Sequence, residues 1–210
     1  MIIGISGYTG SGKSTLAMHL FENYNLFLIN ADRIARAIML QDKTLVEKVD
    51  NAFRVVKDGE IDFAKLGEIV FESADNLRKL NEITFQYTIP DIKSTIELVK
   101  DRNILLDAPL LPLVEPKSLC DFAIWVECPV ETRIERLIIR NEMSREVVKN
   151  RIEKQMEIMP APKADDFWII IENNSEQNQF FEKAEKVIVE RVKSLEKFPF
   201  ADYRVPQLRL

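Results

Sequence analysis

The residues best suited to chemistry form a glycine-rich segment near the beginning of the 210-residue sequence. This segment consists of Gly7, Tyr8, Thr9, Gly10, Ser11, Gly12, Lys13 and Ser14, and it matches the pattern G-x-x-x-x-G-K-[ST]. In this pattern glycines let backbone N–H groups surround phosphate oxygens, the lysine adds charge beside the β and γ phosphates, and the serine hydroxyl can bind Mg²⁺. An apolar run precedes the segment and helical apolar spacing begins at Thr15, so a helix N-terminus would face the anion. The order of strand, loop and helix predicts a nucleoside triphosphate site.

Asp32 is the first candidate for chemistry beyond phosphate binding. It closes the run 28–32, at the end of an expected strand, where open α/β sheets place their ligands. It could accept a proton from an attacking hydroxyl, or it could cap the helix expected over residues 33–40, and one residue can do both. The single histidine, His19, has no evident partner. We therefore expect a carboxylate, not an imidazole, as the proton acceptor.

Asp107 is the second candidate, because it ends the apolar run 104–107. An acidic residue at the end of a strand can hold Mg²⁺ or its waters, and with Ser14 it could complete a magnesium site. The alternative is a turn residue ahead of Pro109.

Three arginines fall on one helical face, opposite an apolar face. They are Arg133, Arg136 and Arg140. None has an acidic residue three or four positions away. Repulsion between the arginines therefore destabilises the helix by about 0.2–0.5 kcal/mol per pair, a cost that bound phosphates would remove by neutralising the charges. A solvated basic face is the alternative. Arg145 and Arg151 in the next helix are weaker candidates, and the two helices, joined around residues 141–144, predict a lid at about 138–160.

Five short β-rich runs alternate with helical segments. They are residues 2–6, 25–30, 103–107, 122–128 and 167–172. Nearly continuous apolar strands separated by helices predict a single α/β domain, residues 1–210, with a parallel sheet covered on both faces. The long gap between the second and third strands predicts a mainly helical insert at about residues 50–100. Within it we expect a turn at Asp58-Gly59, a helix cap at Asp62 and a new helix starting at or near Pro90.

Composition narrows the function classes. The net charge of -5 disfavours binding to nucleic acid or anionic membranes, because the field of the molecule repels polyanions. No apolar run approaches the length of a membrane span, and we expect a cytoplasmic protein. Cys120 and Cys128 lack metal-ligand spacing and are expected as buried thiols. The oligomeric state and a role for the tail, residues 197–210, are not predicted.

Taken together, these segments resemble the dephospho-CoA kinase family, within the nucleoside-monophosphate-kinase-like group of P-loop proteins. The resemblance extends over residues 4–192. Its most specific segments are GISGYTGSGKSTLA (4–17), INADRIAR (29–36), DGEIDFAKLGEIVF (58–71), LLDAPLL (105–111) and RIERLIIRNEMSREVVKNRIEKQ (133–155). The resemblance implies a P-loop three-layer sandwich with a five-stranded parallel sheet, a helical acceptor-binding insert and a helical lid.

The family transfers the γ-phosphoryl group of ATP to the ribose 3′-hydroxyl of dephospho-CoA, the last step of coenzyme A synthesis. The resemblance implies Asp32 as the base, Lys13 and Ser14 as phosphate and Mg²⁺ groups, Arg140 as a lid residue that reaches ATP, and Asn173 near the nucleotide base. Residues 7–15, including Thr15, and Arg136 would then contact the nucleotide. ATP and Mg²⁺ are the expected cofactors, and small molecules are the expected partners.

Four departures from the family pattern lie in or near the acceptor side. Phe53-Arg54 replaces Phe-Gly, Phe63 replaces an Arg, Phe85-Gln86 replaces His-Pro, and Pro112-Leu113 replaces Phe-Glu. The ATP side is intact, so the departures bear on the identity of the acceptor and not on the reaction. Two alternatives stay open, a kinase of another nucleoside-like acceptor and a noncatalytic paralogue that binds ATP. The presence of both Asp32 and Lys13 argues against the second, because a binding module needs no base.

Overall fold

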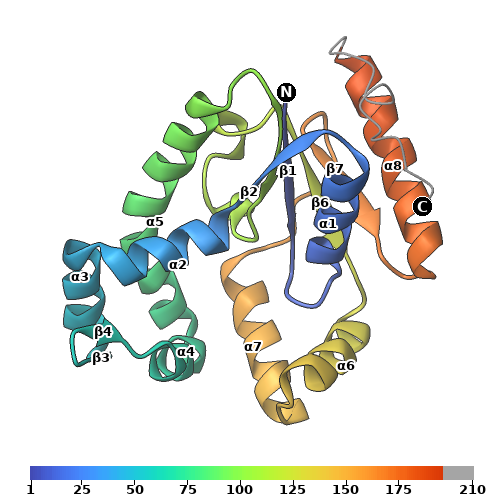
Figure 1. Ribbon diagram of the computed structural model, residues 1–210. Coiled ribbons are helices and arrows are strands. Elements are labelled where there is room, and N and C mark those ends of the chain that lie inside the picture. Colours follow the sequence, from blue (N-terminus) through green and yellow to red (C-terminus); the bar gives the residue numbers. More distant parts are fainter. Residues whose placement is uncertain (196–210) are drawn as a thin grey trace, which may run out of the picture.

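A computed structural model describes residues 1–195 of the chain (Figure 1). The tail 197–210, for which the sequence predicts no role, lies outside the described residues.

The described part of the chain is organised around a five-stranded sheet in the order β2-β5-β1-β6-β7. The strands are β1 (Ile2–Gly7), β2 (Leu26–Asn30), β5 (Asn103–Asp107), β6 (Phe122–Glu127) and β7 (Trp168–Glu172). All four neighbouring pairs are parallel. The α/β class and the five predicted strands are confirmed, with ends that differ by at most one residue. Because the strands are parallel, their carboxyl ends meet at one edge of the sheet.

Helices cover both faces of the sheet, which explains why its strands are apolar without alternation. On one face α1 (Lys13–Asn23) and α8 (Gln177–Ser194) pack against side chains such as Ile5 and Ile124. On the other face α5 (Ala74–Leu98) packs through Ile92 against Ile104 and Trp125. The result is the three-layer arrangement expected from the sequence (Figure 1).

The insert between β2 and β5 has an apolar core of its own. It contains α2 (Ala31–Gln41), α3 (Lys43–Phe53), the hairpin strands β3 (Val56–Lys57) and β4 (Glu60–Ile61), α4 (Phe63–Glu72) and the first part of α5. The expected turn is present, with positive φ at both Asp58 and Gly59, and it joins the two strands of the hairpin. Asp62 caps α4 as predicted, since its Oδ1 accepts from the N–H groups of Ala64 and Lys65.

The expectation that Pro90 starts a new helix is wrong. Pro90 lies inside α5, which runs continuously for 25 residues. A proline inside a helix costs about 3 kcal/mol, and apolar packing on both sides of the proline offsets that cost. Leu80 packs in the insert core before Pro90, and Ile92 packs against the sheet after it.

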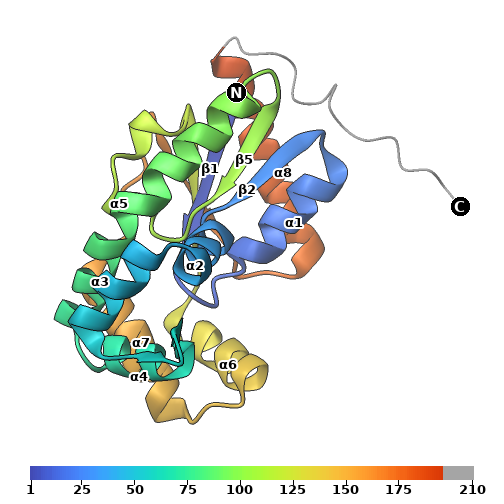
Figure 2. The same cartoon turned by 60° about the vertical axis from the view of Figure 1, so that its left-hand side comes forward.

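The two helices predicted as a lid are α6 (Val130–Asn141) and α7 (Arg145–Ile158). Ser144 caps α7 as expected, because its Oγ accepts from the N–H of Val147. Ile134 and Leu137 pack against Val148 and Ile152, which joins the helices into one unit. Short 3-10 turns at Leu111–Leu113 and Pro116–Ser118 connect β5 to β6. The insert and the α6–α7 pair lie at the same end of the sheet (Figure 2).

Arg54 offers a test of local strain, because it ends α3 in the left-handed conformation with φ of 54°. This conformation costs a residue with a Cβ about 1–2 kcal/mol, a cost that glycine avoids. Glycine, however, loses more conformational entropy on folding, which cancels part of the gain. We therefore expect Arg54→Gly to raise the free energy of unfolding by about 0.5–1 kcal/mol, measured by urea denaturation. Arg54→Ala is the matched control, since it also removes the side chain but keeps Cβ. Equal effects of the two variants would contradict the prediction.

Candidate active site

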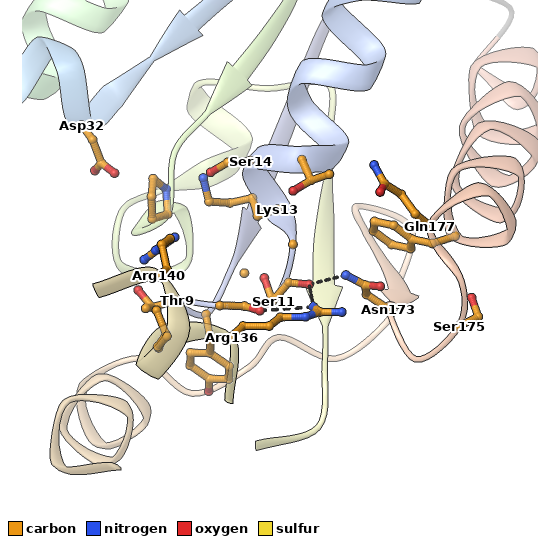
Figure 3. Close-up of a pocket in the computed structure, with 18 residues that line it drawn as sticks. Thr9, Ser11, Lys13, Ser14, Asp32, Arg136, Arg140, Asn173, Ser175 and Gln177 are labelled. Carbon is orange, nitrogen blue, oxygen red and sulfur yellow. Dashed lines mark hydrogen bonds between the residues drawn. The ribbon is translucent and has the colours of Figure 1, made fainter. Parts of the chain in front are cut away.

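A cavity of about 470 Å³ opens at the carboxyl edge of the sheet (Figure 3). Its lining includes the whole glycine-rich segment, from Gly7 to Ser14, and in addition Thr15, Asp32, Arg136, Arg140 and Asn173. These residues come from the β1–α1 loop, α2, α6 and the segment after β7. The structure brings to the cavity wall every residue that the resemblance assigns to the site, but not Asp107 and not the further candidates Arg133, Arg145 and Arg151.

The loop backbone is shaped to bind an anion. Asn173 Nδ2 donates to the carbonyl oxygen of Ser11 at 2.7 Å, and Arg136 Nη1 donates to that of Gly10 at 3.3 Å. In a trans peptide the following N–H points away from the carbonyl, so the contact at Ser11 turns the N–H of Gly12 away from Asn173. The N–H of Ser11 instead donates to the carbonyl oxygen of Tyr8 at 3.1 Å and closes the turn of the loop. Gly12 has φ of 94°, and a Cβ there would lie 2.2 Å from Asn173 Nδ2. Only glycine fits this position.

Lys13 and Asp107 form a buried ion pair at the base of the loop. The second carboxylate oxygen of Asp107 accepts from Asn30 Nδ2 at 3.0 Å, and Asn30 is the register partner of Asp107 across β2 and β5. Both oxygens of Asp107 are thus engaged by side chains of the protein. Its role as a magnesium ligand stays a prediction. In the described structure Asp107 instead pairs with the charge of Lys13.

The donors present fit a magnesium ion bound mainly through a nucleotide. Ser14 lines the cavity, but the described residues contain no group of three or more His, Cys, Asp or Glu side chains placed to hold a metal. Mg²⁺ usually keeps several waters and binds through one or two protein groups plus substrate phosphates. Ser14 is such a group, and the phosphates would supply the other oxygens.

Asp32 lies across the cavity from Lys13 and Ser14 (Figure 3). The alternative that it caps α2 is wrong, because Asn30 is the cap and its Oδ1 accepts from the N–H of Arg33 at 2.9 Å. Asp32 stands in the first turn instead, and its side chain opens to the cavity. Partial desolvation by the surrounding protein raises the pKa of Asp32 above its ordinary value, because it disfavours the charged form. The positive charge of Lys13 lowers this pKa, and the negative charge of Asp107 raises it further. The carboxylate is therefore a stronger base than an exposed aspartate.

The three arginines of α6 do not share one environment, which corrects the predicted basic stripe. Arg136 and Arg140 line the cavity, as expected. Arg133 is only 1% exposed and does not line it, because the first turns of α6 press against the phosphate loop at Gly10.

The weaker candidates in α7 do not line the cavity either. Arg145 pairs with Glu131 of α6, and Arg151 lies over the ring of Phe71 at 4.9 Å from its centroid. Arg145 thus links the two helices of the α6–α7 pair, while Arg151 joins the pair to α4.

Several cavity residues were missed by reasoning from sequence. Ser175, Gln177 and Phe180 follow β7 and line the wall beyond Asn173. Their position after the carboxyl end of a strand could have identified them by the rule that selected Asp32. Gln155 of α7 accepts the N–H of Thr9 at 2.9 Å, a contact across 146 residues that no local pattern signals.

His19 and the two cysteines lie away from the cavity lining. The expectation that His19 lacks a partner is wrong, because its Nε2 lies 2.7 Å from Glu185 Oε1 and its ring stacks on Phe181. Cys120 and Cys128 are buried, as predicted. Burial raises the pKa of the Cys120 thiol to about 12, so it stays protonated and unreactive at neutral pH.

A second, smaller cavity of about 70 Å³ adjoins the first, and both include Asp32 and Pro109 in their walls. Its lining is mostly apolar and comes from α2, α5 and the segment after β5. Among its residues are Phe85, Thr88, Ile92, Leu111 and Val114. A ligand that enters from this side would meet Asp32 at the boundary with the phosphate loop.

The four departures from the family pattern occupy different places. Phe85 lines the smaller cavity. Gln86 accepts from Lys48 at 3.4 Å, and Phe63 lies under the guanidinium of Arg36 at 4.3 Å. Residues 112–113 belong to the 3-10 turn after β5, and Arg54 ends α3. One of the departures therefore changes a cavity wall directly.

Known proteins resemble the chain over nearly its whole length. A family model described as dephospho-CoA kinase matches residues 1–179. A dephospho-CoA kinase of Fusobacterium nucleatum is 35% identical and covers 89% of this chain and 96% of its own, and one of Carboxydothermus hydrogenoformans is 37% identical over 82% and 85%. A solved dephospho-CoA kinase structure from Campylobacter jejuni has the same fold, with a TM-score of 0.60 at 24% identity, covering 92% of this chain and 98% of its own. The complete phosphate loop, the carboxylate opposite it and these matches together place the chain in the dephospho-CoA kinase family of phosphotransferases.

Proposed function

We propose that this kinase transfers the γ-phosphoryl group of ATP to the ribose 3′-hydroxyl of dephospho-CoA, with Asp32 as the base. The observation that carries this assignment is the place of Asp32 on the wall shared by the phosphate-loop cavity and the apolar cavity. A base must lie within hydrogen-bonding reach of the hydroxyl that attacks the phosphate, and a residue at the boundary between the donor cavity and the acceptor cavity meets that requirement.

On the donor side, the loop N–H groups and Lys13 bind the phosphates, while Arg136 and Arg140 extend from α6 into the same cavity. Phosphoryl transfer depends mainly on positioning and on neutralising charge spread over the transferred group, which is the role we assign to these cations. Mg²⁺, held beside Ser14, supplies further neutralisation of phosphate charge when it is bound. Asn173, which fixes the Ser11 carbonyl, shapes the loop and borders the nucleotide.

On the acceptor side, Asp32 accepts the proton of the attacking hydroxyl. Its raised pKa strengthens it as a base, and Lys13 limits the rise so that the ionised form stays available. The apolar wall along α5, with Phe85 and Ile92, would receive apolar parts of the acceptor such as the pantetheine arm. None of the described helices is long and apolar enough to cross a membrane. A cytoplasmic site of action, with small molecules as partners, completes the proposal.

Acceptor identity is tested directly by coupled ADP release with dephospho-CoA, nucleosides and nucleoside monophosphates. We expect turnover with dephospho-CoA and a product phosphorylated at the 3′ position. In thermal denaturation dephospho-CoA at a hundredfold excess over its Kd should stabilise the protein by about 2.7 kcal/mol. If ATP raises the melting temperature while dephospho-CoA neither binds nor reacts, the acceptor assignment fails although ATP binding stands.

Asp32→Asn separates chemistry from folding. Loss of a general base should lower kcat by about 10²–10⁴. The folded-state pKa of Asp32 is raised, but the residue is exposed to solvent and does not cap α2, so the variant should melt at about the same temperature as the wild type. In the wild type, kcat/KM should fall as the pH drops through this raised pKa, at a higher pH than for an ordinary aspartate.

Asp42→Asn is the matched control for Asp32→Asn. Asp42 caps α3 and is absent from the linings of both cavities, and asparagine caps about as well as aspartate. This variant should keep full activity. Loss of activity in Asp32→Asn in proportion to a lowered melting temperature would contradict the assignment of a base.

Closure of the α6–α7 pair is tested by hydrogen exchange. We expect exchange across residues 133–155 to slow when ATP and dephospho-CoA are both bound, because Arg136 and Arg140 would then pair with phosphates. The last two turns of α8 lie away from the cavity and provide the internal reference. Equal exchange in the free protein and a saturated ternary complex would show that this pair does not close.

A further inference from the structure

Arg133 is a buried cation with few partners. Its guanidinium lies on the ring of Tyr8, 4.7 Å from the centroid, and its Nη2 approaches Met156 Sδ at 3.2 Å. Its Nε and Nη1 have no hydrogen-bond partner in the part of the chain that the structure describes. Burial lowers the pKa of Arg133, an effect that nearby Glu127 and Tyr8 oppose. An arginine stays charged under such conditions, so α6 carries an incompletely paired positive charge.

Tyr8 connects this charge to the phosphate loop. Its ring packs edge-on against Trp125 at 4.7 Å, and its hydroxyl donates to the carbonyl oxygen of Met159 at 2.8 Å. The side chain is 5% exposed and has little freedom to move. Arg133 covers the ring and completes the contacts that hold Tyr8 in place.

Arg133 also contacts the loop two residues further on. A Cβ at Gly10 would lie 3.1 Å from the Arg133 carbonyl oxygen and 3.2 Å from its Cα, so the two backbones pack directly. Gly10 has φ of 81°, in the left-handed region. Arg133 therefore contacts residues 8–10 at both ends: its side chain packs on Tyr8, and its backbone packs against Gly10.

The energetics of this arrangement point to a ligand. A buried guanidinium with two unsatisfied donors lowers stability, and apolar residues of similar size often replace buried charges without loss. A polyphosphate in the adjoining cavity would bring negative charge close to Arg133 through a region of low dielectric, where charges interact more strongly than in water. The arrangement is unfavourable in the free protein, and a bound polyphosphate would offset that cost.

We propose that Arg133 is a positioning residue for the nucleotide phosphates. It fixes residues 8–10 in their anion-binding shape through Tyr8, and it supplies positive potential behind the loop without lining the cavity. The proposal rests on ATP being the phosphoryl donor. Arg133 would then affect the binding of ATP but not the binding of the acceptor.

Arg133→Met tests this proposal, since methionine keeps much of the volume and removes the charge. By isothermal titration calorimetry we expect the Kd for Mg-ATP to rise about tenfold, which corresponds to about 1.4 kcal/mol. Binding of adenosine, which lacks phosphates, and the KM for dephospho-CoA should stay unchanged. The melting temperature without ligand should be equal to that of the wild type or higher, because the unsatisfied charge is gone. A merely structural role would lower the melting temperature.

Two further variants complete the test. Arg145→Met is the matched control, because Arg145 is an exposed arginine of the same helix pair and lies outside the cavity lining, and it should leave the Kd for Mg-ATP unchanged. In a double-mutant cycle with Tyr8→Leu, the effects on that Kd should be less than additive if the stack transmits the effect. Wild-type Mg-ATP affinity in Arg133→Met, or equal weakening of adenosine and ATP, would overturn the proposal. Failure of the wild-type protein to bind Mg-ATP would instead refute the proposed function.

Discussion

The ion pair between Lys13 and Asp107 joins the phosphate loop to the sheet. Lys13 begins α1 and Asp107 ends β5, while Asn30, at the end of β2, binds the second oxygen of the same carboxylate. Three elements thus meet at one buried aspartate at the carboxyl edge. Asp32, two residues beyond Asn30, owes its place opposite the loop to this junction. Its pKa depends on both members of the ion pair, so the base and the phosphate-binding lysine form one electrostatic unit.

This unit makes the two halves of the site depend on each other. A phosphate bound at Lys13 would compete with Asp107 for this cation, while Asn30 binds the other oxygen of Asp107. The phosphate and a less fully neutralised Asp107 would then both disfavour the ionised form of Asp32. The arginines that enter the same cavity from α6 can offset that effect. The cations of α6 therefore matter for the base as well as for the phosphates.

Features set by local physics could be predicted from the sequence. The five strands, the Asp58-Gly59 turn and the caps at Asp62 and Ser144 follow from neighbouring residues alone, and the structure confirms them. Features set by distant contacts could not. Packing on either side of Pro90 keeps α5 continuous, and Glu185, 166 residues from His19, supplies its partner.

The same distinction explains the candidate site. Most of its residues were predictable, because parallel strands bring the ends of separate apolar runs together. The split between Arg133 and its two helical neighbours was not, because helical periodicity says which residues share a face but not that the phosphate loop covers part of that face. The engagement of Asp107 by Lys13 likewise depends on the spacing of two elements that no sequence pattern reports.

The unbroken course of α5 has a consequence for how acceptor selectivity can change. Helix α5 packs in the insert core at Leu80 and against the sheet at Ile92. Between these two points, Phe85 and Thr88 of the same helix line the apolar cavity. A continuous helix held at both ends cannot swing one end without disturbing the other core. The position of this cavity wall is therefore coupled to both cores, so exchanges of single side chains along this face of α5 could reshape the cavity without moving the helix.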